Sequence, residues 1–380
     1  MKIKLYQNFL YILYSSLLVL AGFFFFYQRN ISGESLIYTL GIDEINYINM
    51  ANGLDSITFN LHKCRFFIPS ILKVLPFKAI NELFIFNLIS LIFLFYSLIK
   101  LTKEYLISDK IIFLNLLIFL SAFSVSYNFS NFYLMDVSSM TTIIFFLISI
   151  IRKSFFFALF WIVISVLIRE NAIIFLPIFY ITFSKRFSLL SSLIILITYF
   201  LPKIIISNGA CITSIIDLEK FSALFESIFY IKGYLSYGSL WFLGTVGLFY
   251  FKHKNRHIYK VTMFFSLFSI LGSFFSSMFS FSDITRMCIL MFPCLFLGTS
   301  FFLNKIYNLK NSIYFLMLLI FCGFVLITNL IPNVIVNGNF NSLDNYILSN
   351  YVVVTISLIL QFFISIYLIK KYLNNKIINQ

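Results

Sequence analysis

Long apolar stretches recur along the whole chain and are separated by short polar breaks. A helix needs roughly 20 apolar residues, within a range of about 17–25, to cross the hydrocarbon core of a bilayer. The pattern predicts about twelve such helices, with ten or eleven as alternative counts. They cover residues 7–27, 82–99, 111–128, 137–151, 154–168, 171–184, 187–201, 236–251, 261–280, 286–303, 312–331 and 350–369. The expected fold is therefore all-α, a polytopic transmembrane helix bundle.

Two of the polar breaks are long enough to carry structure of their own. Residues 28–81 form a polar first loop, in which we expect a short juxtamembrane helix. Residues 202–235 form a second loop, where apolar residues at helical spacing between 217 and 232 predict an amphipathic helix lying on the membrane surface. No other break is long enough to fold alone. The chain is thus expected to be a single integral membrane domain over residues 1–380.

The composition and the placement of positive charge agree with this class. The chain is 61% hydrophobic and 11% charged, which excludes an ordinary soluble domain. Of its 28 basic residues, 18 fall in alternate breaks or at the two ends of the chain. By the positive-inside rule that side is cytoplasmic, and both termini lie there. The net charge of +14 is then a topology signal, and no nucleic-acid partner is expected.

Negative charge has the opposite distribution. Twelve of the fourteen carboxylates fall on the outer side, and only Glu104 and Asp109 lie on the cytoplasmic side. Orientation alone does not require carboxylates on the outer face, since the positive-inside rule depends on Lys and Arg. Several of these acids lie at helix ends. The distribution indicates that binding or chemistry takes place on the outer face.

The first candidate site lies in the first outer loop, at Asp43 and Glu44. If a helix begins there, Asp43 shares a face with Tyr47, Met50 and Ala51, because positions three and four apart align. A carboxylate at the head of a packing face could act as a general base or bind a divalent cation. The alternative is a helix N-cap, for which Asp is among the preferred residues.

Arg65 is the second candidate, in a basic run that also contains His62, Lys63, Lys73 and Lys78. Its planar guanidinium can bond two phosphate oxygens at once. The run lies on the side opposite to the cytoplasmic positive charge, so orientation does not explain it. Snorkelling toward lipid headgroups is the alternative explanation.

Three later breaks each offer an acid at the outer end of helices. Asp136 is the only charged residue between Lys110 and Arg152, and helix capping is its alternative role. An ionisable residue at membrane depth is otherwise a functional candidate. Two further candidates are pairs of one acid and one arginine that lie close together in the sequence. Each pair could be only a local ion pair. They are Arg169 with Glu170, and Asp283 with Arg286.

Together these residues resemble the polytopic glycosyltransferases of the GT-C class, which use polyprenyl-phosphate-linked sugars on the outer face of a membrane. The resemblance covers most of the chain through short motifs. In chain order they are Asp43-x-x-x-Tyr47-x-x-x-Ala51, Arg65-x-x-x-Pro69, Asp136, Arg169-Glu170 before Leu176-Pro177, and Asp283-x-x-Arg286 before Pro293.

The resemblance implies a role for each position. Asp43 is expected to be the catalytic acid that deprotonates the acceptor or holds a metal, with Glu44 as its catalytic partner or second ligand. A divalent cation, magnesium or manganese, is the candidate cofactor. The tandem Asp-Asp or Asp-x-Asp of many such enzymes is absent, so metal use stays open. The residues expected to bind substrate are Tyr47, Arg65, Asp136, Arg169, Glu170, Asp283 and Arg286.

The expected function is transfer of a sugar from a polyprenyl-phosphate donor to a glycan or lipid acceptor of the cell envelope. The expected location is a bacterial inner (plasma) membrane, with the active face on the periplasmic or extracellular side. An O-antigen polymerase or ligase is a second interpretation, although such enzymes usually place their largest outer loop late in the chain. Two further interpretations are a transporter or flippase for a lipid-linked sugar and a structural membrane protein without catalysis.

Overall fold

The computed structural model describes most of the first 306 residues of the chain. The described ranges are 2–27, 42–53, 65–74, 79–120, 135–207, 237, 240–279 and 288–306, with eight single positions between 356 and 370. Within these ranges every regular element is a helix, and none is a strand. The all-α prediction is therefore confirmed for the part of the chain that the structure describes.

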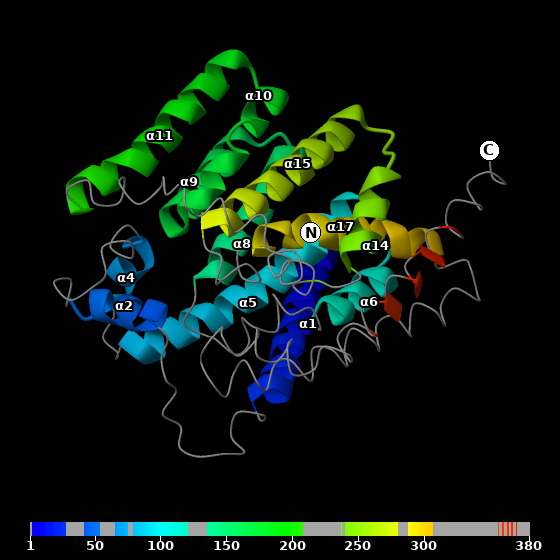
Figure 1. Cartoon of the computed structure of the whole chain (residues 1–380), viewed down its shortest axis with the longest axis horizontal. Helices are drawn as coiled ribbons and strands as arrows, with labels where there is room; N and C mark the ends of the chain where they lie inside the picture. The colour runs from blue at the N-terminus through cyan, green and yellow to red at the C-terminus, as the bar shows by residue number, and fades with distance from the viewer. Residues whose placement is uncertain are drawn as a thin grey trace.

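The described helices follow the apolar stretches of the sequence (Figure 1). The elements are α1 (Lys2–Tyr27), α2 (Ile42–Ala51), α4 (Phe67–Leu72), α5 (Ala79–Glu104), α6 (Asp109–Leu120), α8 (Asp136–Ile151), α9 (Phe155–Ile168), the 3-10 helix η3 (Glu170–Phe175), α10 (Ile178–Thr182), α11 (Lys185–Ser207), α14 (Leu240–Phe249), α15 (Arg256–Phe279), the 3-10 helix η6 (Cys288–Met291) and α17 (Phe292–Ile306).

Two predicted helices differ from the structure. The helix expected over residues 171–184 is two short elements, η3 and α10, which Pro177 separates. Proline has no N–H and its ring conflicts with a continuing helix, so the apolar run changes direction there. The helix expected over residues 286–303 begins as the 3-10 turn η6 and becomes α-helical only at Phe292. The helices predicted at 312–331 and 350–369, and the surface helix at 217–232, lie outside the continuously described ranges.

Two described helices are long and apolar enough to cross a membrane, judged by length and composition alone. They are the stretches Leu83–Glu104 of α5 and Arg256–Phe274 of α15. Five shorter apolar helices accompany them, among them Asp136–Ile151 and Phe155–Ile168. Membrane association is supported to this extent, and the total of about twelve crossings stays a prediction.

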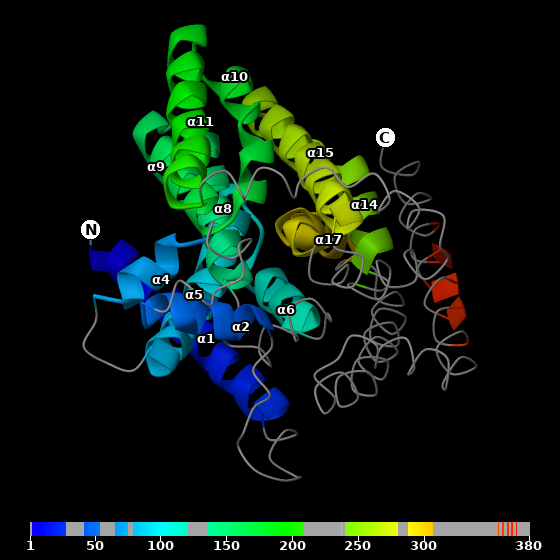
Figure 2. The ribbon, with the colours of Figure 1, turned by 60° about the vertical axis from the view of Figure 1, so that its left-hand side comes forward.

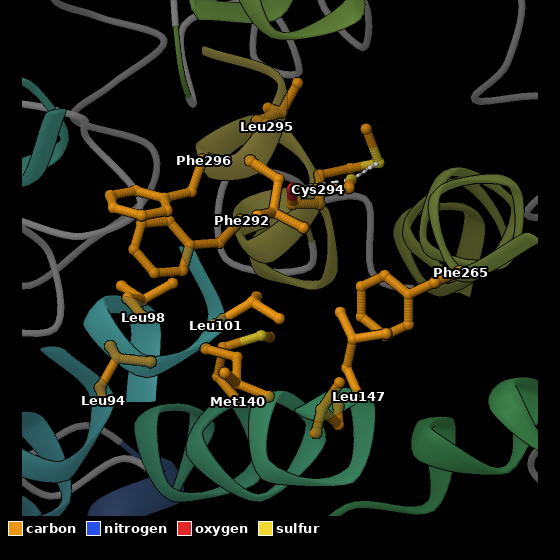
Figure 3. Close-up of a cluster of buried hydrophobic side chains, with 14 of the residues drawn as sticks. Leu94, Leu98, Leu101, Met140, Leu147, Phe265, Phe292, Cys294, Leu295 and Phe296 are labelled. Atoms are coloured by element: carbon orange, nitrogen blue, oxygen red, sulfur yellow. Dashed lines mark hydrogen bonds between the residues drawn. The ribbon is translucent and has the colours of Figure 1, made fainter. Parts of the chain in front are cut away.

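The core is built around α8, which is buried along nearly its whole length between α5 and α9. Farther along the chain, α14 packs along α17, and α15 contacts η3, α10 and η6 (Figure 2). A close-up of this core shows side chains of α5, α8, α15 and α17 meeting in one apolar cluster (Figure 3). Phe119 packs edge to face against Phe292 and Phe296 within the core, with ring centroids 5.3 and 5.2 Å apart.

A second, smaller apolar cluster holds α2 and α4 against the ends of three longer helices. We call it the α2–α4 cluster, and its buried members are Tyr47, Met50, Ala51, Ile68, Leu72, Leu83, Met135 and Ile168. Tyr47, Met50 and Ala51, which the spacing placed on one face of the predicted helix together with Asp43, are therefore buried. Met135 directly precedes α8 and Ile168 ends α9. The cluster thus fixes α2 and α4 beside the α8–α9 hairpin.

Charged residues gather at the other end of that hairpin, which we call the Arg152 end. Arg152 binds Glu104, with its Nε 2.9 Å from Glu104 Oε1, and Lys103 lies 2.6 Å from Asp109. The His257 ring nitrogen lies 3.2 Å from the carbonyl oxygen of Ile150. The breaks around α5, α8 and α15 that carry the predicted cytoplasmic charges thus meet at one end of the helices.

Three glycines allow α14 and α17 to approach each other closely, and this gives a test of the packing. A Cβ at Gly247 would overlap the carbonyl oxygen of Gly298, and a Cβ at Gly298 would overlap that of Gly244. Because the obstacle is backbone, we expect Gly247→Val to lower the free energy of unfolding by about 3 kcal/mol. Thermal unfolding of the purified protein measures it. The control is Thr245→Val on the exposed side of α14, expected to change it by less than about 0.5 kcal/mol. Equal effects of the two substitutions would contradict the packing.

Candidate functional site

Arg65 is the centre of a polar group that lies on the α2–α4 cluster. It stands just before α4, and its guanidinium extends toward α2 on one side and η3 on the other. Nη1 donates to the hydroxyl of Tyr47 at 3.2 Å, and Nη2 binds Glu170 Oε1, also at 3.2 Å. Only 12% of the Arg65 side chain is exposed. The alternative of snorkelling toward lipid headgroups is therefore wrong for this residue, since its charged end is held inside the protein.

Asp136 and Arg169 form a second ion pair beside the first. Asp136 lies in the first turn of α8, where a carboxylate is favoured by the helix dipole. Arg169 ends α9 in an extended conformation, and its backbone N–H bonds the carbonyl oxygen of Ser165. The Asp136 side chain is 0% exposed and that of Arg169 is 4% exposed. The pair joins the start of one helix to the end of the next.

The two pairs are linked because Arg169 and Glu170 are consecutive. Arg169 turns toward Asp136 and Glu170 turns toward Arg65, so the alternative of a merely local Arg169–Glu170 pair is wrong. The alternative of helix capping is likewise wrong for Asp136, since Met135 occupies the N-cap and no side chain caps α8. We call the five residues Tyr47, Arg65, Asp136, Arg169 and Glu170 the Arg65 cluster. It carries two positive and two negative charges.

Electrostatics hold both members of the Arg65–Glu170 pair in their charged forms. Burial by itself raises the pKa of Glu170, but the charge and hydrogen bond of Arg65, and the charge of Arg169, outweigh it and lower the pKa to about 2. Burial by itself lowers the pKa of Arg65, and the Glu170 carboxylate and the Tyr47 hydroxyl outweigh that effect and raise it. Glu170 is therefore not a general base that titrates near neutral pH.

This lowered pKa predicts how stability depends on pH. A carboxyl group whose pKa is depressed on folding contributes stability above its unfolded pKa, here 4.5, and loses it as the pH falls toward about 2. The melting temperatures of the wild type and of Glu170→Gln should therefore differ by a constant amount above about pH 5 and converge below it. Thermal melts of both proteins across that range measure it. A difference that stays constant down to about pH 3 would contradict the lowered pKa.

The structure describes the remaining candidate residues only in part. The backbone places Asp43 and Glu44 in the first turn of α2, one turn before Tyr47, and their side chains lie outside those that the structure describes. Asp283 and Arg286 lie outside the described residues altogether. Among the described side chains, no three metal-ligating groups gather in one place. Asp136 and Glu170 already bind guanidinium groups, so the described part of the cluster does not fit a divalent cation.

Two serines lie one helical turn from the Asp136–Arg169 pair and belong to the site. They are uncharged, so the charge pattern of the sequence does not indicate them. Ser139 lies one turn after Asp136 on α8, and Ser165 lies one turn before Arg169 on α9. Both are buried, and the Ser165 hydroxyl donates to the carbonyl oxygen of Ser139 at 3.4 Å. Their small side chains let α8 and α9 approach at the point where the pair forms. The helical spacing from Asp136 and Arg169 is the signal that could have found them.

No protein-family model matches this chain, and a search of curated proteins found no match to it.

Proposed function

We propose that the chain is a polytopic membrane protein of about twelve helices whose Arg65 cluster faces the outer side. The exposed side chains support this. On α9, Phe156 and Phe157 are 79% and 64% exposed, and on α11 Leu193 and Ile204 are 57% and 58% exposed. Large apolar side chains on the outside of such helices are costly in water and are favourable against lipid. The concentration of basic residues at the Arg152 end supports a cytoplasmic position for that end.

We propose that the protein is a glycosyltransferase that uses a polyprenyl-phosphate-linked sugar, and that it acts on the side that carries the Arg65 cluster. The observation that carries the proposal is the convergence of Tyr47, Arg65 and Arg169-Glu170 at one end of the bundle. Arg65 and Glu170 are 105 positions apart in the sequence, and all of these residues were expected on the same side. A lipid phosphate is anchored at headgroup level, so a cation that binds it has to lie at a helix end and not at mid-membrane.

The proposed reaction forms one bond and breaks one. The acceptor hydroxyl oxygen attacks the anomeric carbon of the sugar, and the bond from that carbon to the phosphate oxygen breaks. The phosphate of the lipid leaves with the electron pair, and the Asp43 carboxylate takes the proton of the acceptor hydroxyl. Glu44, in the same turn of α2, is the catalytic partner in this proposal. No step requires a metal ion.

Arg65 stabilises the negative charge that develops on the leaving phosphate. A guanidinium has five N–H donors, of which Tyr47 and Glu170 hold two, and 12% of the Arg65 side chain is exposed, so further donors remain for the phosphate. Glu170 orients the guanidinium. Because Asp136 and Arg169 are almost fully buried, we propose that they position Glu170 and do not contact the substrate. Asp283 and Arg286 keep their proposed role in substrate binding.

The test is an assay with purified protein in lipid vesicles and synthetic polyprenyl-phosphate sugars, each carrying a labelled sugar. Transfer of label to an added glycan or lipid acceptor, lost in Asp43→Asn, supports the proposal. If no candidate sugar is transferred but the labelled donor moves between leaflets, the protein is a flippase. Chain growth from a diphosphate-linked oligosaccharide would indicate a polymerase or ligase instead. Transfer that is equal in the wild type and Asp43→Asn would contradict the catalytic role of Asp43.

A further inference from the structure

The helix α15 buries a stripe of hydroxyl side chains and exposes large apolar side chains on its other side. Its described serine and threonine residues fall on one stripe at helical spacing, and each is at most 5% exposed. They are Thr262, Ser266, Ser269 and Ser273. The opposite face carries Phe264, Leu267, Ile270 and Phe274, which are 40–47% exposed. A soluble protein would present the reverse arrangement, with the apolar stripe toward the core.

The partners of these hydroxyls change along the helix. Thr262 donates to the carbonyl oxygen of Ile258 at 2.7 Å, and its oxygen lies 2.6 Å from the hydroxyl of Tyr105. The hydroxyls of Ser266 and Ser273 have no hydrogen-bond partner among the described residues. A buried hydroxyl without a partner is unfavourable, and ordered water is its common partner in proteins.

This lack of partners is shared with the hydroxyls of Ser139, Thr182 and Thr299, but it is the minority arrangement among the described helices. Most other described helical serines and threonines bond a carbonyl in the preceding turn of their own helix. Examples are Ser15, Ser90, Ser149, Ser188 and Thr198. The same local bond is sterically available to any helical serine. Ser266 and Ser273 do not make it, and both side chains are buried inside the bundle.

The stripe lies along the contact of α15 with its inner neighbours. α15 packs against η6 and α17, and Ser269 lies beside the thiol of Cys294 on α17. Figure 3 shows Cys294 and Phe265 directed toward the same interior region from these two helices. From Thr262 to Ser273 the stripe extends about 16 Å, at a rise of about 1.5 Å per residue. It begins beside Tyr105, at the Arg152 end, and runs toward Gly272, which lies against Ile174 of η3.

We propose that the hydroxyl stripe of α15 is a water-binding seam inside the bundle, in which ordered water molecules bond Ser266 and Ser273. Water supplies both a donor and an acceptor to each hydroxyl, and no charged group is needed. The seam gives the bundle a hydrated path along α15 from the Tyr105–Thr262 contact toward the end that carries η3. It is independent of the Arg65 cluster and of the reaction proposed there.

Thiol labelling of the full chain in lipid vesicles tests the seam. Ser266→Cys and Ser273→Cys place nearly isosteric thiols in the stripe, and Val261→Cys is the control on a fully buried apolar position of the same helix. A thiol reacts as its thiolate, which forms in water and is suppressed in apolar surroundings, so we expect both seam thiols to react with a small cationic methanethiosulfonate at least about tenfold faster than the control. Peptide mass spectrometry separates them from the native cysteines. Rates no faster than that of Val261→Cys would overturn the proposal.

Alanine substitution provides a second measurement that does not depend on labelling. If water bonds the two hydroxyls, Ser266→Ala with Ser273→Ala removes its partners, and the melting temperature of the double variant should fall. If the seam is dry, removing two hydroxyls without partners should leave the melting temperature unchanged or raise it. An unchanged or raised melting temperature would therefore also overturn the proposal.

Discussion

Asp136→Asn is expected to lower the free energy of unfolding by about 3–5 kcal/mol, the largest effect on stability that a single described side chain should give. The reason is the burial of its partner. The Arg169 side chain is only 4% exposed, so the substitution leaves its guanidinium away from water without a counter-charge. The cost is that of the uncompensated charge and exceeds what the pair contributes by itself. Thermal or denaturant unfolding of the purified protein in detergent measures it.

The ion pair at the Arg152 end is a matched control for this prediction. Arg152 and Glu104 also join two helices, but 56% of the Arg152 side chain is exposed. Glu104→Gln should therefore cost less than about 1 kcal/mol. The double substitution Asp136→Leu with Arg169→Met removes both charges and should recover most of the stability that Asp136→Asn loses. If Asp136→Asn and Glu104→Gln destabilise the protein equally, the pair is not buried in the way described.

Within the described ranges, the sequence was sufficient to predict that the long apolar stretches are helical and that Tyr47, Met50 and Ala51 of α2 are buried. The spacing of apolar residues and the length of each apolar stretch determine these features locally. Tyr47, Met50 and Ala51 follow one another at helical spacing, and all three are buried. Hydropathy alone does not predict where a helix within an apolar stretch is interrupted. Residues 171–184 read as one helix, and only the position of Pro177 within the run indicates the break between η3 and α10.

The partners within the Arg65 cluster could not be predicted from the sequence. Arg65 and Glu170 are separated by 105 positions, and their contact depends on how α4 packs beside the end of α9. Adjacent opposite charges, as in Arg169-Glu170, suggest a local pair. An extended residue at the end of α9 instead directs the two side chains to different partners. The local sequence thus identified the charged residues of the site. Which of them form ion pairs with each other depends on tertiary packing.

Arg65→Ala is expected to reduce sugar transfer by about 100–1,000-fold, the effect typical of removing one group that stabilises developing charge. Its guanidinium is held by Tyr47 and Glu170, and 12% of the side chain remains exposed. The loss should appear mainly in kcat, because the charge on the leaving phosphate increases in the transition state. Arg65→Lys retains the charge but not the planar fork, so it should recover activity only in part. Initial rates with a polyprenyl-phosphate sugar, measured with vesicle-embedded protein, give both quantities.

Lys73→Ala is the control that separates this role from a general effect of positive charge. Lys73 lies at the end of α4, eight positions after Arg65, and is exposed. Removing it should change the rate by less than about twofold, as expected for a screened surface charge. A similar loss in Lys73→Ala and Arg65→Ala would indicate that the rate depends on the electrostatic potential of the whole face. A loss in Arg65→Ala alone, with partial recovery in Arg65→Lys, requires a guanidinium held at one position. In the proposed arrangement Glu170 orients that guanidinium, and the adjacent Arg169 is anchored by the buried Asp136.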